Sequence, residues 1–408
     1  MQTLLFISHR FPYPPDRGEK IRGIYLIRHL ATRYRVLLGC LVDQESDWQH
    51  LDVLRGVCAE VAAFPLDKRA QKWRALARIR PGRPLMLDYY ANRDLRAWVD
   101  QAVARERPEI LYLYSTAMAP YGLHHEGRRI LDMQDVDSEK WAEYARGARF
   151  PMKLVWAREA RTLLAYERRA TMACERTFLV SEPECRRFRE LAPEVDGRVM
   201  PIENGVDLDQ FTPDRAFESP YRDAGPHLVF VGNMDYWPNA DAATWFAREV
   251  LPLVQAELPA ARFHAVGANP GQNVLALGAL PGVQVTGRVP DVRPYVAHAD
   301  VVVAPLRIAR GIQNKVLEGM AMGRPVVATP QAFEGVHAEP GRDLLVGEGA
   351  ERLAALALEV LRGEHPGLGA AARDAVSRRH TWEASLRRLD AVLESADHEG
   401  PALSGSLT

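Results

Sequence analysis

The sequence predicts an α/β protein made of two Rossmann-like domains. Short apolar runs of strand type alternate with helical stretches along the chain, which is the pattern of parallel sheets covered by helices. The alternation stops once, in a segment at 209–226 that is rich in proline, aspartate and glycine, and then begins again. At 408 residues the chain is also too long for one compact core. We therefore expect a first domain at 1–208, a linker at 209–226 and a second domain at 227–378.

The strands are predicted from short apolar runs, and the helices from a hydrophobic period of about 3.6 residues. In the first domain we expect strands at 3–8, 34–40, 110–114, 129–133 and 176–180, and helices around 20–33, 93–106, 153–173 and 182–191. In the second domain we expect strands at 227–231, 262–266, 283–286, 301–304 and 326–328. A last helix follows at 379–396, and residues 397–408 lack apolar content, which favours a flexible tail.

Residues 310–329, RGIQNKVLEGMAMGRPVVAT, carry the strongest functional signal. Helical periodicity from about Ile312 places apolar side chains toward a sheet. Gly323 fits the left-handed position just after a helix, and Pro325 forbids its continuation. The following apolar run reads as a buried parallel strand. A helix that leads into a buried parallel strand begins beside the carboxyl edge of the sheet. Ligands bind at that edge in such folds.

The start of this helix has the features of a phosphate site. Gly311 can bring its backbone close to a ligand because it has no Cβ. Arg310 and Lys315 lie around the helix N-terminus, where amide groups and the helix dipole favour an anion. Glu318 follows one turn deeper. The alternative is a plain crossover helix with a Lys315–Glu318 pair on its exposed face.

Composition and charge exclude several classes of protein. Net charge is −1, but residues 1–200 carry 34 basic and 27 acidic side chains, and residues 201–408 carry 18 and 26. The basic residues lack interleaved aromatics, which argues against nucleic acid as a partner. The four cysteines have no metal-type spacing and fit free thiols in a reducing compartment. The N-terminus has no signal-peptide pattern and no run of 18 apolar residues occurs, so we expect a cytoplasmic protein.

The motif Glu318-Gly319-Met320-Ala321-Met322-Gly323-Arg324-Pro325-Val326-Val327 resembles the donor-nucleotide motif of family 4 glycosyltransferases, which are retaining enzymes of GT-B fold. In that family two glutamates stand eight positions apart, and Arg310 occupies the first position here. The resemblance implies that Glu318 holds the ribose hydroxyls of a nucleotide, a task that suits a carboxylate. It also implies two facing domains with a cleft between them, and a helix at 379–396 that packs on the first domain.

The resemblance extends over other motifs of the second domain. It implies that Gly232, Asn233, Gly311 and Ile312 bind the nucleotide sugar, as do Arg288 and Val289 in the loop that meets the base. A surface salt bridge is the alternative for the arginine of that loop. The turn at 204–207, Asn-Gly-Val-Asp, matches the family's turn before the linker and reads as a hinge.

The second domain also departs from the family pattern. The family places a basic residue directly after the first-strand glycine and a lysine a few positions on, and here Asn233 and Met234 follow Gly232. We interpret Arg310 and Lys315 as the cations that replace this missing charge. Together with Asp135 in the first domain, these two residues are the expected catalytic groups.

In the first domain, the resemblance places the acceptor beside loops that follow strands. Gly18 is expected to approach the donor phosphates closely, and Lys20 or Arg22 to add charge. Asp135 and Asp137 are expected to contact an acceptor hydroxyl, whereas Asp132 lies within the strand. The alternative for these paired acids is a glycosidase. His124 is expected near the acceptor, although His125 and His9 are equal candidates by sequence.

The segment at 66–84 is basic, with Trp73, Leu76 and Ile79 at helical spacing. It could lie on an anionic membrane near a lipid-linked acceptor. The alternative is a solvated helix that packs its apolar face on the domain. Peripheral contact with the inner face of the plasma membrane is therefore one expectation for this chain.

The sequence thus predicts a glycosyltransferase that moves a sugar from a nucleotide-diphosphate sugar to a polysaccharide or lipid-linked glycan. The stretches SHRFPYPPDRGEK, DVDSEKW and GIQNKVLEGMAMG resemble sugar transferases associated with exosortase A and exopolysaccharide clusters. No metal and no cofactor is expected, because no acidic pair or histidine cluster accompanies the phosphate site. The alternatives are an epimerase or phosphorylase of the same fold, and a non-catalytic module that binds nucleotide sugars.

Overall fold

The computed structural model describes residues 1–77, 79–309 and 311–395. The chain divides into two compact units, Met1–Ile202 and Glu203–Thr408, and each is described by itself. The expected linker at 209–226 lies close to this division, and the packing of the last helix on the first domain remains a prediction.

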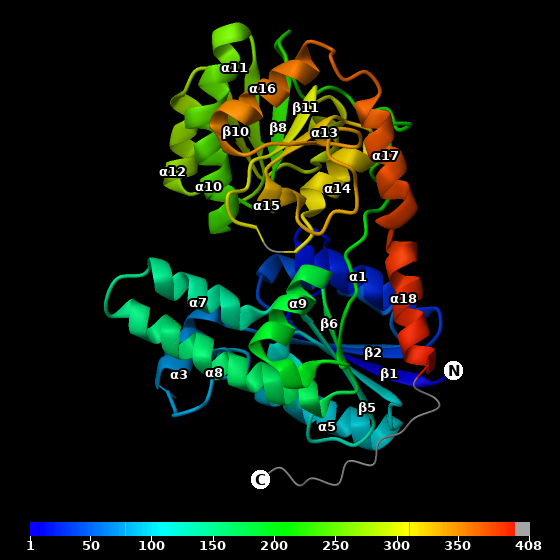
Figure 1. Cartoon of the computed structure of the whole chain (residues 1–408). Helices are drawn as coiled ribbons and strands as arrows, with labels where there is room; N and C mark the ends of the chain where they lie inside the picture. The colour runs from blue at the N-terminus through cyan, green and yellow to red at the C-terminus, as the bar shows by residue number, and fades with distance from the viewer. Residues whose placement is uncertain (78, 310, 396–408) are drawn as a thin grey trace. The chain divides into compact units, whose positions relative to one another are not determined.

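Unit 1 is a parallel sheet of seven strands covered by helices (Figure 1). The strand order is β3-β2-β1-β4-β5-β6-β7. The strands are β1 (Thr3–Ser8), β2 (Arg35–Val42), β3 (Glu60–Pro65), β4 (Ile110–Tyr114), β5 (Arg128–Gln134), β6 (Arg176–Leu179) and β7 (Val199–Pro201). The α-helices are α1 (Gly18–Ala31), α2 (Leu51–Arg55), α3 (Lys68–Ala77), α4 (Leu85–Tyr89), α5 (Arg93–Glu106), α6 (Ala119–Gly122), α7 (Asp137–Gly147), α8 (Met152–Ala173) and α9 (Glu182–Leu191). Short 3₁₀ turns lie at η1 (Glu45–His50), η2 (Thr116–Met118) and η3 (Pro193–Val195).

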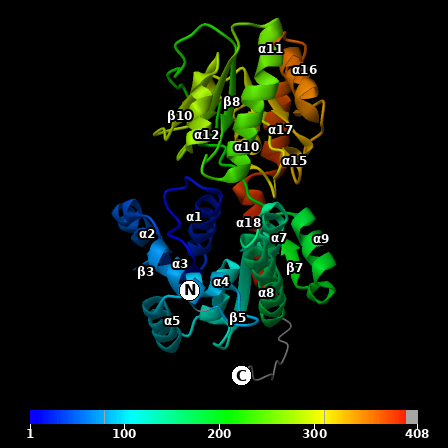
Figure 2. The same cartoon turned by 90° about the vertical axis from the view of Figure 1, so that its left-hand side faces the viewer.

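Unit 2 is a parallel sheet of six strands in the order β10-β9-β8-β11-β12-β13, again with helices on both faces (Figure 2). Its strands are β8 (His227–Val231), β9 (Arg262–Val266), β10 (Val283–Gly287), β11 (Val301–Ala304), β12 (Val326–Ala328) and β13 (Leu345–Val346). Its helices are α10 (Trp237–Trp245), η4 (Phe246–Val250), α11 (Leu251–Glu257), α12 (Gln272–Leu275), η5 (Ala276–Ala279), α13 (Arg293–Ala297), α14 (Asn314–Ala321), α15 (Pro330–Phe333), α16 (Gly349–Leu361), α17 (Leu368–Arg379) and α18 (Trp382–Ser395).

The central strands confirm the prediction of two Rossmann-like domains. Strands such as β1, β4, β8 and β11 are buried nearly throughout, because helices cover both faces of a parallel sheet. The predicted strands at 3–8, 110–114, 227–231, 262–266, 301–304 and 326–328 match the structure at both ends. The edge strands β3, β7 and β13 were not predicted. They are short or only half-buried, so their sequences lack a continuous apolar run.

The helix that carries the strongest sequence signal begins later than predicted. α14 begins at Asn314 and not at Ile312, because Gly311 has a φ of +62° and Gln313 is extended at the N-cap. The predicted end is confirmed. Gly323 has a φ of +64°, and its amide and that of Arg324 donate to the carbonyls of Met320 and Gly319, which is a Schellman turn.

Candidate functional site

The strand order of each sheet reverses at one point, and such points carry the ligand sites of open α/β sheets. In unit 2 the order reverses between β8 and β11. Gly232 and Asn233 follow β8 at the carboxyl edge, and Arg288 follows β10 at the same edge. Lys315 and Glu318 lie on α14, which follows β11. The structure thus brings the candidate donor residues to one edge of one sheet.

Lys315 has a position that suits a phosphate-binding cation. Its Nζ donates to Asn239 Oδ1 and to Gln313 Oε1, both at 3.2 Å, and lies 5.6 Å from the centre of the Phe230 ring. Burial lowers the pKa of Lys315 to about 8, and Glu318 opposes this shift. Within the described ranges no carboxylate lies at ion-pair distance from Lys315. Neutral oxygens hold the ammonium in place, so its positive charge remains available to an anion.

Asn239 is the residue of this site that the sequence analysis missed. It lies in the first turn of α10, where its Nδ2 donates to the carbonyl of Asn233 at 2.9 Å and its Oδ1 accepts from Lys315. A Cβ on Gly232 would lie 2.9 Å from its carboxamide carbon. The glycine after β8 therefore makes room for this side chain, whereas we expected it to admit the ligand. An asparagine at a helix start gives no sequence signal beyond local capping.

Glu318 lies in the second turn of α14 and is partly buried. Burial raises the pKa of its carboxyl to about 7, and the charge of Lys315 opposes the shift. In the portion of the chain that the structure describes, no hydrogen bond or ion pair engages this carboxylate. The alternative of an exposed Lys315–Glu318 pair is therefore wrong: both side chains are partly buried, and the two are not within ion-pair distance. The described residues therefore leave this partly buried carboxylate open to accept hydrogen bonds from the hydroxyls of a ligand.

The remaining donor candidates differ in which of their atoms can contact a ligand. Gly311 is buried in a left-handed conformation, and the Ile312 side chain packs into the core, so only backbone atoms of these two can meet a ligand. Val289 packs against the same core, and Arg288 is exposed. Arg310 lies outside the described residues.

In unit 1 the strand order reverses between β1 and β4. Gly18 is exposed at the first turn of α1, and a Cβ there would meet nothing within 4 Å, so its surroundings are open. Asp135 is exposed just after β5. Asp137 begins α7, and burial raises the pKa of its carboxyl. These three residues lie at the carboxyl edge, as predicted.

Of the two candidates His9 and His124, His9 lies at this edge and His124 does not. His9 follows β1, its Nδ1 lies 3.3 Å from the carbonyl oxygen of Tyr114 at the end of β4, and its ring packs edge-on against Tyr90. Burial, with the charge of Arg10, lowers the pKa of His9 to about 4. The imidazole is therefore neutral at physiological pH. His9 and His124 were equal candidates by sequence, and the order of the strands separates them.

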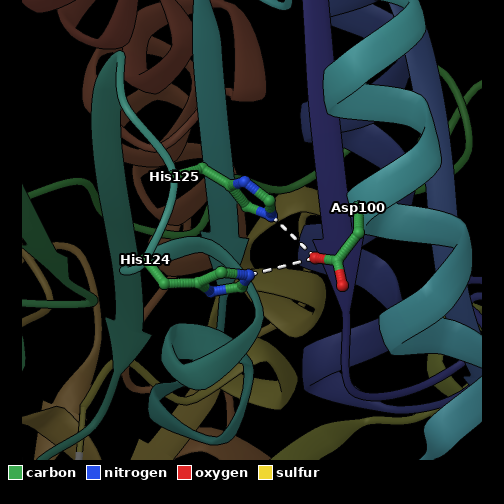
Figure 3. Close-up of side chains that lie close together, drawn as sticks. All are labelled: Asp100, His124 and His125. Carbon is green, nitrogen blue, oxygen red and sulfur yellow. Dashed lines mark hydrogen bonds and ion pairs between the residues drawn. The ribbon is translucent and has the colours of Figure 1, made fainter.

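His124 is a correction. It lies between α6 and β5, at the amino end of the strand, away from the loops that bind ligands. Its Nε2 and that of His125 lie 3.0 and 2.9 Å from one oxygen of Asp100 on α5 (Figure 3). These three groups could ligate a metal ion. However, Arg96 Nη1 lies 3.1 Å from His124 Nδ1, which places a cation beside the cluster.

Lys20 is a second correction. Lys20 is 1% exposed, and its Nζ donates to both carboxylate oxygens of Asp47 at 2.9 Å. Arg22, the other candidate cation, donates through Nε to both oxygens of buried Asp132, and through Nη1 to the carbonyl of Ile202. Neither cation can reach a ligand without breaking a buried ion pair, which is a large cost. Both pairs join residues far apart in sequence, so the sequence alone could not reveal them.

The comparisons with known proteins agree with this architecture. Residues 225–363 match the family model described as glycosyl transferases group 1. HepE from Anabaena, solved with UDP and glucose, superposes with a TM-score of 0.68 at 15% identity, covering 97% of this chain and 100% of that one. The chain has the GT-B fold. Sucrose-phosphate synthase from Thermosynechococcus elongatus superposes at 0.67 and 15% identity, covering 97% and 99% of the two chains.

A third similar structure is that of WaaG, a glycosyltransferase involved in lipopolysaccharide biosynthesis, with a TM-score of 0.65, 14% identity and coverage of 95% and 99%. No curated protein matches the chain in sequence. The family match contains β8 to α16, and with them every donor candidate of unit 2 named above. Among the described residues, no helix is long and apolar enough to cross a membrane.

Replacing Asn239 with alanine should weaken the affinity for a nucleoside diphosphate by about 1–3 kcal/mol, because Lys315 loses one of its two acceptors and the Asn233 carbonyl loses a donor. Isothermal calorimetry measures this change. Asn273→Ala is the matched control, since Asn273 is an exposed asparagine on α12 of the same unit. Equal affinities of Asn239→Ala and the wild-type protein would show that Asn239 does not position the site.

Removal of divalent metal should leave sugar transfer unchanged. Lys315 and the backbone amides before α14 can neutralise a diphosphate without a bridging ion. The check is the transfer rate in EDTA, with Mg²⁺ or Mn²⁺ added back. A rate abolished by EDTA and restored by either ion would contradict this assignment of the charge balance.

Proposed function

We propose that this protein is a glycosyltransferase that uses a nucleotide-diphosphate sugar as its donor. The observation that carries the proposal is that Lys315 and Glu318 lie on the same helix, α14, at the carboxyl edge of the sheet. Lys315 supplies a partly buried cation held by neutral groups, and Glu318 supplies a partly buried carboxylate that has no hydrogen bond or ion pair among the residues that the structure describes. A diphosphate next to a ribose presents matching chemistry. The match of residues 225–363 to group 1 glycosyl transferases supports the same function.

The proposed reaction is sugar transfer to a hydroxyl of a glycan acceptor. The acceptor oxygen forms a bond to the anomeric carbon on the face from which the diphosphate departs, as the bond from that carbon to the diphosphate breaks. The hydroxyl proton passes to an oxygen of the departing diphosphate. Negative charge grows on the leaving diphosphate, where Lys315 stabilises it. Glu318 accepts hydrogen bonds from the ribose hydroxyls. We assign retention of the sugar's configuration to this reaction, and a hexose as the sugar transferred.

The donor and acceptor are proposed at the level of chemical class. The similar structure of HepE was solved with UDP and with UDP-glucose, which supports UDP sugars as the first donors to test. We assign Asp135 and Asp137 of unit 1 to the acceptor. We propose a role in exopolysaccharide biosynthesis, as in the exosortase-associated transferases, at the cytoplasmic side of the membrane. No cofactor beyond the donor is proposed.

A single assay separates this proposal from its alternatives. Purified protein is incubated with UDP-glucose or other nucleotide sugars, with and without a mixture of polyprenyl-linked glycans, and the products are separated. A transferase releases the nucleoside diphosphate and labels the acceptor only when the acceptor is present. Release without an acceptor indicates an epimerase-type reaction or hydrolysis. Binding of the donor without any product would indicate a non-catalytic module and would refute the proposal.

A further inference from the structure

The positive excess of residues 1–200 comes from two segments. Residues 68–83 carry seven basic side chains and no acidic one, and residues 140–158 carry five and one. The other residues of 1–200 carry 22 basic and 26 acidic side chains, so the positive excess of this half comes entirely from these two segments. The first contains α3, and the second contains the turn between α7 and α8.

Large apolar side chains are exposed in the same two segments. Phe150 is 79% exposed, Leu154 62% and Met152 41% at the turn between α7 and α8, and Ile79 is 51% exposed after α3. Elsewhere in the described part of unit 1, exposed large apolar side chains are restricted to Met1 and Met172. Basic side chains are exposed around the same turn: Arg146, Arg149 and Lys153. Near Ile79, Arg80 is exposed and Arg83 is partly exposed. The combination of exposed apolar and basic side chains is local.

The fold joins the two segments and holds them firmly. Arg158 on α8 donates through Nη2 to the carbonyls of Arg80 and Arg83, the latter at 3.0 Å. Buried Glu159 accepts from the amides of Leu85 and Met86 at 2.7 and 2.9 Å. These bonds fix the chain after α3 along the first turns of α8.

The turn itself stands on two packed helices. α7 and α8 lie side by side and meet at a turn on the outer margin of the unit (Figure 1). Behind the turn, Trp141 of α7 stacks on Trp156 of α8, with ring centres 4.8 Å apart, and Tyr144 packs edge-on against Trp141. The aromatic contacts bury part of each ring, so the exposed side chains are presented on a rigid base.

We propose that this surface, the α7–α8 tip (residues 146–154 together with 79–83), binds an anionic lipid bilayer. Apolar side chains that project from a rigid turn can enter the headgroup region, and the surrounding arginines and lysines meet the lipid phosphates. A polyanionic glycan would explain the charge but would leave Phe150 and Leu154 without a role. The inference names a partner beyond the proposed sugar transfer, and its test uses no donor, so the two can fail separately.

The test is sedimentation of the full-length protein with vesicles of phosphatidylglycerol mixed with phosphatidylcholine, and with vesicles of phosphatidylcholine alone. The wild-type protein should bind the anionic vesicles at least about tenfold more tightly, and added salt should weaken the binding. The double variants Phe150→Ser/Leu154→Ser and Arg149→Glu/Lys153→Glu should each lose most of the binding. The matched control is Leu253→Ser/Leu275→Ser, because these leucines are 40% and 45% exposed in unit 2.

Each outcome decides the inference, provided that circular dichroism shows the variants folded. Loss of binding in both tip variants and wild-type binding in the control support it. Binding that survives Phe150→Ser/Leu154→Ser but not the charge reversal would indicate a general polyanion surface and would overturn it. Equal binding to both vesicle types, or no binding at all, would overturn it as well.

Discussion

Replacing Lys315 with alanine should lower kcat for sugar transfer by about 10²–10³-fold, with a smaller effect on the affinity for the nucleoside diphosphate. The ammonium is held by Asn239 and Gln313, and it lies at the sheet edge where a diphosphate would sit. Negative charge on the diphosphate grows as the glycosidic bond breaks. An interaction that strengthens toward the transition state raises kcat more than it raises binding.

The measurement for Lys315 is steady-state transfer with UDP-glucose, or with whichever donor proves active, beside calorimetry with the corresponding diphosphate. Arg352→Ala is the control, because Arg352 is an exposed cation of unit 2 that pairs with Glu359 on α16. Lys315→Arg should retain a part of the activity, since the charge remains. Full turnover in Lys315→Ala would show that the leaving group is stabilised elsewhere, and Arg310 would then be the next residue to test.

Nucleotide affinity should depend on pH as a bell with its maximum between about pH 7 and 8. The pKa of Glu318 is raised to about 7, so its carboxylate is lost as the pH falls below 7, and with it the acceptor for the ribose hydroxyls. The pKa of Lys315 is lowered to about 8, so its charge is lost as the pH rises above 8. Both limbs therefore reduce affinity on moving away from the optimum, by up to about tenfold per pH unit.

Variants separate the two limbs of this profile. Glu318→Ala should weaken binding by about 1.5–3 kcal/mol at pH 7.5, the range for hydrogen bonds to a charged group. In Glu318→Gln, the loss of affinity below pH 7 should become smaller. The remaining loss should come from protonation of the nucleotide's own phosphate, which titrates near pH 6. Lys315→Arg should remove the alkaline limb. An acidic limb that is unchanged in Glu318→Gln would show that this carboxylate does not contact the nucleotide.

The local sequence pattern was sufficient to predict the central strands of each sheet and the helix α14. Buried parallel strands are continuous apolar runs, so β1, β4, β8 and β11 were predicted with their bounds. The end of α14 was predicted because Gly323 can adopt the left-handed conformation after a helix at low cost. Lys315 and Glu318 were found through a contiguous motif, and the structure brings them to the carboxyl edge as expected.

Contacts between segments that are distant in the chain could not be predicted from the sequence. Lys20 looked available at a helix start, but its partner Asp47 lies in η1, 27 positions away. Asn239 was overlooked because its bonds to Asn233 and Lys315 join three separate segments. His124 follows a strand in sequence, yet α6 carries it to the opposite edge of the sheet. In each case the pattern gave the residue type, and only the packing of elements gave its surroundings.

The central claim is that the carboxyl edge of the unit 2 sheet holds a nucleoside diphosphate. Hydrogen–deuterium exchange of the full-length protein, with and without saturating UDP, GDP or ADP, tests it most directly. The account predicts that at least one of these nucleotides slows amide exchange at 230–239, 286–290 and 311–319, and leaves the segment at 93–127, with Asp100 and His124, unchanged. Protection confined to unit 1, or no protection by any nucleoside diphosphate, would contradict it.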